Sequence, residues 1–158
     1  MEYKVEAKEG ETVYMSVEES ETGITKFWEK VNNNGAIDIL HEVKSGEAPN
    51  THGRIIGVWQ LSEADDDSVI YTIGTEYMQG SNIYPLKIIE VPEAKWMVFK
   101  CKGAVPAAMG KSYHEIFDNV LPQTDYKIST KMFLEIYNIS DAKSDDYHFE
   151  IWVPISEA

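Results

Sequence analysis

An internal repeat limits what this chain can fold into more than any other feature of its sequence. Residues 58–74 align without a gap on residues 136–152. Each segment has two runs typical of strands around an acidic loop of the same length, which is the pattern of a β-hairpin. Identical residues or aromatic rings meet in the pairs Ser62 with Ser140, Ala64 with Ala142, Asp67 with Asp145, Ile73 with Ile151, Trp59 with Tyr137 and Tyr71 with Phe149.

A second similarity lies upstream of the two hairpins. Residues 27–31 resemble residues 116–120, at a different offset because the first half carries additional loop around residues 32–53. One matched hairpin can arise by chance, but the added helix match favours duplication. Each half then consists of a strand, a helix and two strands. We therefore predict a single α+β domain over residues 1–158, with pseudo-repeat halves at about 1–85 and 86–158.

The predicted architecture is a pair of β-α-β-β units related by a pseudo-two-fold axis. Antiparallel sheets and two main helices would enclose a central cleft, which is a natural place for a ligand. The strands are expected where β-branched and aromatic residues concentrate or alternate, at residues 11–17, 54–61, 69–78, 94–102, 132–139 and 147–155.

Two segments are predicted to be helical. The first is about residues 24–31, with a possible extra turn at 36–40. The second is about residues 106–120, because Pro106 suits a first helical turn and apolar residues then recur every three or four positions. Leu121 precedes a proline, so we expect the helix to end there. Loops are expected at residues 44–53, 62–68 and 140–146.

The composition excludes several classes of partner. The formal net charge of −13 opposes nucleic acid, anionic membranes and phosphate-rich substrates, and Arg54 is the only arginine. The same charge favours cations weakly and also serves solubility. The sequence shows no signal peptide and no membrane-spanning run. With Cys101 as its only cysteine, we expect a soluble, cytoplasmic protein.

No common catalytic or metal-binding pattern is present. The chain lacks a glycine-rich phosphate loop, a Gly-x-Ser-x-Gly elbow and a His-Glu-x-x-His motif. Its four histidines have no metal-ligand spacing. Cys101 lies between two lysines in an apolar strand, where a structural thiol is favoured over a nucleophile. We therefore expect no catalytic residue, no metal site and no cofactor.

The aromatic residues and one glutamate are the candidates for binding. The chain holds four Trp, nine Tyr and five Phe, and ring faces attract cations. Strand alternation places Glu150 and Trp152 on the face opposite Phe149 and Ile151. That face is either solvated or lines the cleft. In the cleft, Glu150 would be the counter-charge for a cation, and the repeat matches it with Thr72, so this charge belongs to one half only.

The sequence resembles the GyrI-like small-molecule-binding domain, the effector-binding domain of bacterial AraC- and MerR-type multidrug-binding transcription regulators, in a stand-alone form. The resemblance covers nearly the whole chain and is strongest in the second half. It is carried by residues 96–103, 113–117, Leu121 with Pro122, 133–137 and 146–155, and more loosely by 27–29, 56–58 and 71–74. The acidic start of the chain is predicted to form strands, so no helix-turn-helix is expected there.

The resemblance implies a duplicated β-α-β-β fold and an aromatic pocket that holds lipophilic cations against a glutamate on a late strand. Glu150 stands at the matching motif position, and the walls implied by motif, fold and alternation are Tyr137, Trp152, Trp59, Tyr71, Trp96 and Tyr113. The expected function is binding of amphipathic cations, as a sequestering protein or as the sensor of a regulator. A hydrolase of electrophilic small molecules that uses the same glutamate, and a gyrase-interacting inhibitor, remain alternatives. The sequence does not give the oligomeric state.

Overall fold

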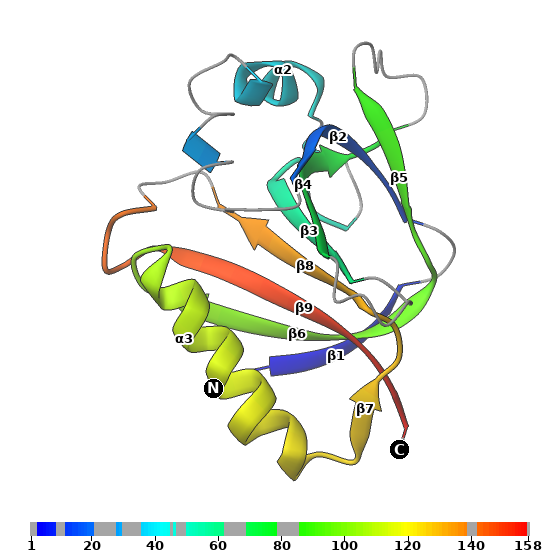
Figure 1. Ribbon diagram of the computed structural model, residues 1–158, viewed down its shortest axis with the longest axis vertical. Coiled ribbons are helices and arrows are strands. Elements are labelled where there is room, and N and C mark those ends of the chain that lie inside the picture. The colour runs from blue at the N-terminus through cyan, green and yellow to red at the C-terminus, as the bar shows by residue number, and fades with distance from the viewer. Residues whose placement is uncertain are drawn as a thin grey trace.

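The computed structural model describes residues 3–8, 12–20, 28–29, 36–44, 46, 50–61, 69–78, 86–138 and 142–157. Within these residues, nine strands form one antiparallel sheet and two α-helices pack on it (Figure 1). The strands are β1 (Tyr3–Lys8), β2 (Thr12–Ser20), β3 (Ile55–Leu61), β4 (Val69–Glu76), β5 (Lys87–Val91), β6 (Ala94–Lys102), β7 (Tyr126–Ile128), β8 (Met132–Tyr137) and β9 (His148–Glu157). The helices are α2 (Ala36–Val43) and α3 (Ala107–Glu115).

The order of the strands is symmetric about the middle of the sheet. It runs β1-β6-β9-β8-β3-β4-β2-β5, with β7 paired to β9. The two hairpins of the repeat, β3–β4 and β8–β9, meet at the centre, and β2 and β6 follow on either side. The outermost strands are exchanged, because β1 lies beside β6 and β5 lies beside β2. The predicted α+β fold with duplicated units is confirmed, while the division at residue 85 stays a prediction.

The symmetry axis can be located from the register of the central strands. Extended by one residue toward the N-terminus, the gap-free repeat alignment matches Gly57 with Glu135. The sheet register places the same two residues opposite each other on β3 and β8. Equivalent residues of two halves can face each other only where the axis passes. The pseudo-two-fold axis therefore runs through the Gly57–Glu135 pair.

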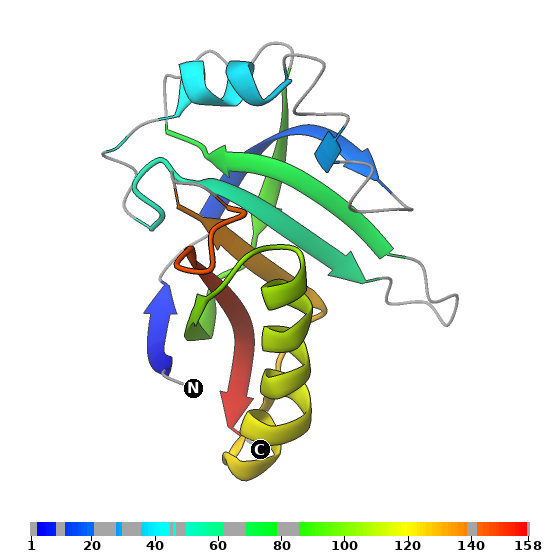
Figure 2. The same cartoon turned by 90° about the vertical axis from the view of Figure 1, so that its left-hand side faces the viewer.

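The two faces of the sheet are both buried, but by different partners. On the face that we call the helical face, α2 packs over β3 and β4 and α3 packs over β6 and β9 (Figure 2). Its core includes Leu40, Ile73, Phe99, Ile116 and Ile151. On the opposite face, which we call the inner face, the strongly twisted sheet curves over an apolar cluster of its own. Its members include Tyr14, Val58, Trp96, Leu134 and Trp152.

The elements differ from the sequence expectations in identifiable places. The strands β5 and β7 were not predicted, since they are only five and three residues long and β5, with Ile88 beside Ile89, shows no alternation. Pro122 does not end the second helical segment, because α3 continues as a π-helical turn, Ile116–Val120, and a 3-10 turn, Leu121–Gln123, whose first positions tolerate proline.

The first helical region is described only in part. Trp28 and Glu29 are helical, and the rest of the predicted helix at 24–31 lies outside the described residues. The turn predicted at 36–40 is the helix α2, which reaches Val43. No helix in the described ranges is long and apolar enough to cross a membrane.

Candidate functional site

The carboxylate of Glu135 lies on the helical face at the pseudo-two-fold axis, and the residue is 2% exposed. Four uncharged side chains donate hydrogen bonds to it. Glu135 Oε1 accepts from the hydroxyls of Tyr71 and Tyr137, both at 2.7 Å. Glu135 Oε2 accepts from Trp59 Nε1 at 2.6 Å and from the Tyr113 hydroxyl at 2.7 Å. We call these five residues the Glu135 cage.

Both halves of the protein contribute to the cage. Trp59 and Tyr71 come from the hairpin β3–β4 of the first half, whereas Tyr137 follows Glu135 on β8 and Tyr113 reaches across from α3. Alternation along β8 places Glu135 and Tyr137 on the same face, because they are two residues apart. One carboxylate thus joins three strands and a helix.

Gly57 makes the space that the cage needs. A Cβ atom on Gly57 would lie 2.1 Å from the Tyr71 hydroxyl oxygen and 2.9 Å from Glu135 Oε1. Because Gly57 and Glu135 are equivalent in the repeat, two side chains would compete for the volume around the axis. The absence of a side chain at Gly57 lets the Tyr71 hydroxyl occupy that volume and bind Glu135.

The cage stabilises the carboxylate of Glu135 by hydrogen bonds rather than by an ion pair. No ion pair between described residues includes Glu135. A buried carboxylate requires strong hydrogen bonds to replace lost water, and here four neutral donors supply them. Burial, and then the charge of Glu135, raises the pKa of Tyr71, Tyr113 and Tyr137 well above its ordinary value. These hydroxyls therefore remain protonated and able to donate.

Aromatic rings surround the polar centre. Trp59 and Tyr71 meet edge to face at 5.2 Å between centroids, and Tyr113 stacks on Phe117 at 6.0 Å. Trp28 stands edge to face with Tyr137 at 4.9 Å, and its Nε1 donates to the Tyr71 hydroxyl at 3.2 Å. Trp28 thereby covers part of the cage. Two hollows at the surface, of about 450 and 330 Å3, are lined by other residues, so neither is the predicted central cleft.

Four of the seven residues selected from the sequence meet in the cage, namely Trp59, Tyr71, Tyr113 and Tyr137. The glutamate at their centre was missed. Glu135 belongs to the motif at 133–137, but nothing in the alternation alone distinguished it from other strand glutamates. The signal that could have found it is its repeat partner, since a large polar residue matched with a glycine marks a place where symmetry has to break.

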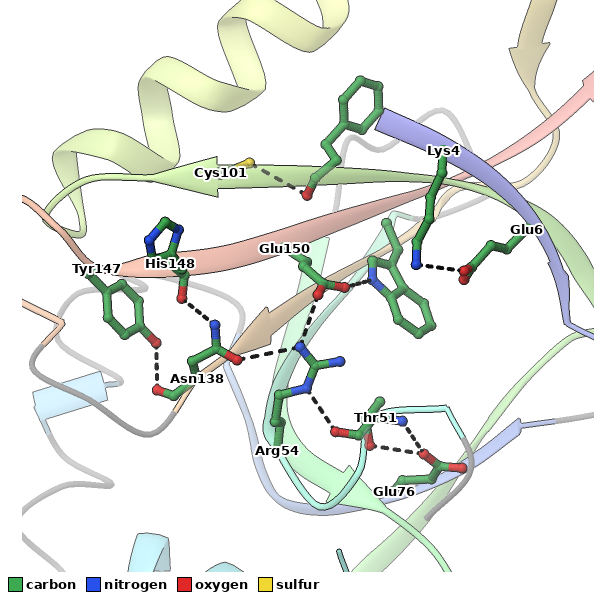
Figure 3. Close-up of polar contacts among 12 residues, drawn as sticks. Lys4, Glu6, Thr51, Arg54, Glu76, Cys101, Asn138, Tyr147, His148 and Glu150 are labelled. Carbon is green, nitrogen blue, oxygen red and sulfur yellow. Dashed lines mark hydrogen bonds and ion pairs between the residues drawn. The ribbon is translucent and has the colours of Figure 1, made fainter. Parts of the chain in front are cut away.

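The structure corrects the placement of Glu150. Its carboxylate lies on the inner face, where Arg54 Nη1 is 3.0 Å from Glu150 Oε2 and Trp152 Nε1 donates to Glu150 Oε1 at 2.9 Å (Figure 3). Alternation separates Glu150 from the cage, because Glu135 pairs with the neighbouring residue, Ile151. The seven selected residues therefore do not form one site, because Glu150 shares its face with Trp96 and Trp152 rather than with the four rings of the cage. The role of Glu150 in ligand binding stays an untested prediction.

Trp96 and Trp152, the other two selected rings, share the inner face with Glu150. Their centroids are 6.2 Å apart, and each residue is 2% exposed. Arg54 also donates through Nε to the carbonyl of Thr51 at 2.8 Å, and Thr51 in turn donates to the buried carboxylate of Glu76 (Figure 3). On the inner face, Arg54 therefore compensates the charge of Glu150, whereas Glu76 accepts hydrogen bonds from neutral groups of Asn50 and Thr51.

No group of three or more His, Cys, Asp or Glu residues in the described ranges is arranged to hold a metal ion. The Cys101 thiol is buried, and burial raises its pKa to about 11, so the thiolate is scarce at neutral pH. The polar groups of the Glu135 cage are one carboxylate, three tyrosine hydroxyls and one indole N–H.

Residues 4–155 match the family model Cass2, described as an integron-associated effector binding protein. The sequence matches no curated protein. The fold is similar to that of SAV2435 bound to tetraphenylphosphonium, with a TM-score of 0.81 and 24% identity over 99% of this chain and 94% of that chain. A putative transcription regulation protein from Staphylococcus aureus MU50 gives a TM-score of 0.80 and 25% identity over 99% of both chains. The EcmrR C-terminal domain gives 0.60 and 15% over 100% of both.

Replacing Gly57 by alanine should disrupt the cage. The added methyl group has no room beside the Tyr71 hydroxyl and Glu135, so we expect Gly57→Ala to lower the free energy of unfolding by about 1–3 kcal/mol. Gly110→Ala is the matched control, because Gly110 is exposed on α3 with no atom near the new methyl. It should stabilise the protein by about 0.5–1 kcal/mol. Urea unfolding measures both, and equal effects of the two changes would contradict the packing described for Gly57.

The cage tyrosines should resist alkaline titration. Because the folded pKa values of Tyr71, Tyr113 and Tyr137 lie above the unfolded value of about 10, their stabilising contribution is complete below pH 10 and is lost as the pH rises further. Glu135→Gln should lower these pKa values without restoring them to 10, since burial remains. Ultraviolet titration of tyrosinate measures this, and ionisation of all nine tyrosines in one step near pH 10 in the folded protein would contradict it.

Proposed function

The chain belongs to the Cass2 family of integron-associated effector-binding proteins, and from this premise we propose that it binds a lipophilic organic cation at the Glu135 cage. The observation that carries the proposal is a carboxylate, 2% exposed, whose four hydrogen-bond donors are all uncharged. A cation brought near it would supply the missing counter-charge in a region of low dielectric, where the attraction is stronger than in water.

The cage also favours one kind of cation. A carboxylate has about four lone-pair sites, and the four donors of the cage match that number. A ligand that needs to donate a hydrogen bond would have to displace a tyrosine or Trp59. A quaternary ammonium or phosphonium ion carries its charge without donors and is attracted through space, and ring faces stabilise it by about 0.5–2 kcal/mol.

The position of Trp28 suggests where the ligand enters. Trp28 contacts Tyr137 through its ring and Tyr71 through its indole nitrogen. An aromatic group of the ligand could replace both contacts with similar ones, while its cationic centre approaches Glu135. The similar fold of a protein bound to tetraphenylphosphonium supports the choice of that compound as the first probe. Such binding suits a sensor module that reports to a regulatory partner, or a protein that sequesters toxic cations.

The same geometry argues against general-base chemistry at Glu135. To accept a proton, the carboxylate would have to give up one of its four hydrogen bonds. Binding needs no such rearrangement. Turnover of an electrophilic small molecule that disappears in Glu135→Gln would instead support a hydrolase.

The proposal is tested by titrating the protein with tetraphenylphosphonium and following tryptophan fluorescence. Glu135→Gln removes the charge but keeps the shape of the side chain, and we expect it to weaken binding about tenfold or more. Glu150→Gln is the matched control on the inner face, where Arg54 already compensates the charge, and should change the affinity less than twofold. The opposite ranking of the two variants would place the ligand's charge at Glu150 and overturn the proposal.

A pair of ligands tests the preference for cations without donors. Benzyltrimethylammonium and protonated benzyldimethylamine differ by one methyl group in place of one N–H. Calorimetry should find the quaternary ion to bind more tightly at a pH where both are charged. Tighter binding of the protonated amine would show that the cage opens to accept a hydrogen bond.

A further inference from the structure

The strand β1 leaves an open edge at one end of the sheet. It pairs with β6 on one side, and no described strand pairs with its other side. Tyr3 is 44% exposed and Val5 is 38% exposed, so apolar side chains line this edge. An exposed edge strand with apolar side chains is a template for pairing with another strand.

The two faces of β1 carry different chemistry. Tyr3, Val5 and Ala7 alternate with Lys4 and Glu6, so the apolar residues lie on the helical face. There Tyr3 packs against Phe99 with centroids 5.4 Å apart. On the inner face, Lys4 Nζ is 2.7 Å from Glu6 Oε1. The strand therefore presents an apolar row on one face and the oppositely charged pair Lys4 and Glu6 on the other.

We propose that β1 pairs with β1 of a second copy of this chain, antiparallel and about a two-fold axis through Val5. In this register Lys4 faces Glu6 of the second copy, Glu6 faces Lys4, Tyr3 faces Ala7, and the two Val5 side chains meet at the axis. Each charge gains an opposite neighbour across the interface, and the internal Lys4–Glu6 pair becomes part of an alternating group of four. Opposite charges directly across an antiparallel pair stabilise it.

The sequence of β1 selects this register over its neighbours. Moving the axis by one residue to Lys4 places the two Lys4 side chains opposite each other, and moving it to Glu6 does the same for the two Glu6 side chains. Like charges directly opposite are destabilising. An axis between two residues would pair side chains that point to opposite faces of the continuous sheet. An axis through Ala7 also places Glu6 opposite Lys8 by register, but it pairs only residues 6–8 of β1, whereas the axis through Val5 pairs residues 3–7. The axis through Val5 therefore satisfies the faces and the charges over most of the strand.

The other edge of the sheet lacks this property. On β5, Lys87 and Glu90 are three residues apart and point to opposite faces, so no register of two copies brings them together. Ile88 on β5 is nevertheless 44% exposed, as much as Tyr3. The two edges therefore differ in charge pattern rather than in exposed apolar surface, and β5 provides the control.

The dimer should be weak and depend on concentration, because one six-residue edge buries less area than a stable interface needs. Sedimentation equilibrium of the whole chain at about 150 mM salt, where the net charge of −13 is screened beyond about 8 Å, measures it up to about 1 mM protein. We expect reversible monomer–dimer behaviour. A monomer at every concentration would overturn the proposal.

Charge reversal tests the register. Lys4→Glu places two acidic residues opposite each other, and Glu6→Lys places two lysines opposite each other. We therefore expect the dimer dissociation constant of each variant alone to rise at least about tenfold. An equal mixture of the two should form a heterodimer, since each reversed charge then faces its opposite. The double change, Lys4→Glu with Glu6→Lys, should dimerise like the original chain. If the mixture associates no better than the single variants, the register is wrong.

Two lysine substitutions separate β1 from β5. Val5→Lys places like charges at the proposed axis and should abolish dimerisation, whereas Ile88→Lys on the other edge should leave it unchanged. Circular dichroism verifies that both exposed-site variants fold. Loss of the dimer only in Ile88→Lys would move the interface to β5 and overturn the proposal.

Discussion

The carboxylate of Glu135 occupies the symmetry axis of a duplicated fold, where only one of two equivalent side chains can fit. Gly57 occupies the equivalent position in the other half and leaves space that the Tyr71 hydroxyl fills. The hydrogen bonds of the Glu135 cage depend on this difference between Gly57 and Glu135. The strands β3, β4 and β8 and the helix α3 supply neutral donors to the charge of Glu135 on β8, so the site joins the two halves of the protein.

The two glutamates considered for the cation site illustrate how burial and compensation differ. Glu150 lies on the inner face with the guanidinium of Arg54 at 3.0 Å, and its charge is neutralised within the protein. Glu135 has hydrogen bonds but no cation among the described residues. A buried carboxylate that has hydrogen bonds but no counter-ion still attracts an incoming cation. The two glutamates therefore differ in compensation as well as in exposure, and the binding role that we propose for Glu135 rests on the first difference.

Much of the fold followed from the sequence because its signals are local and repeated. The alternation of apolar residues located the hairpin strands β3, β4, β8 and β9. The matched acidic loops within the two hairpins indicated the duplication. Alternation also separated Glu150 from Phe149 and Ile151 correctly. It could not say which face carries the helices, because both faces of this sheet are buried and apolar residues occur on each.

The candidate site was harder to predict because it depends on contacts between distant segments. Motif, fold and alternation selected the four cage rings, yet the meeting of Tyr113 from α3 with Trp59 from β3 depends on how the helix crosses the sheet. Glu150 was selected from alternation and from its place in the family motif, and its match with Thr72 only added to this. The match of Glu135 with Gly57 lies one residue outside the aligned segment. Symmetry of the register, available only from the structure, identifies that position as the axis.

A crystal structure of the chain with bound tetraphenylphosphonium tests the central claim most directly, because it locates the ligand's charge. We expect the phosphorus on the helical face, within about 6 Å of cage ring faces and nearer to Glu135 than to any other carboxylate, with Trp28 displaced from Tyr137. A phosphonium ion on the inner face beside Glu150, with the Glu135 cage closed as before, would contradict it.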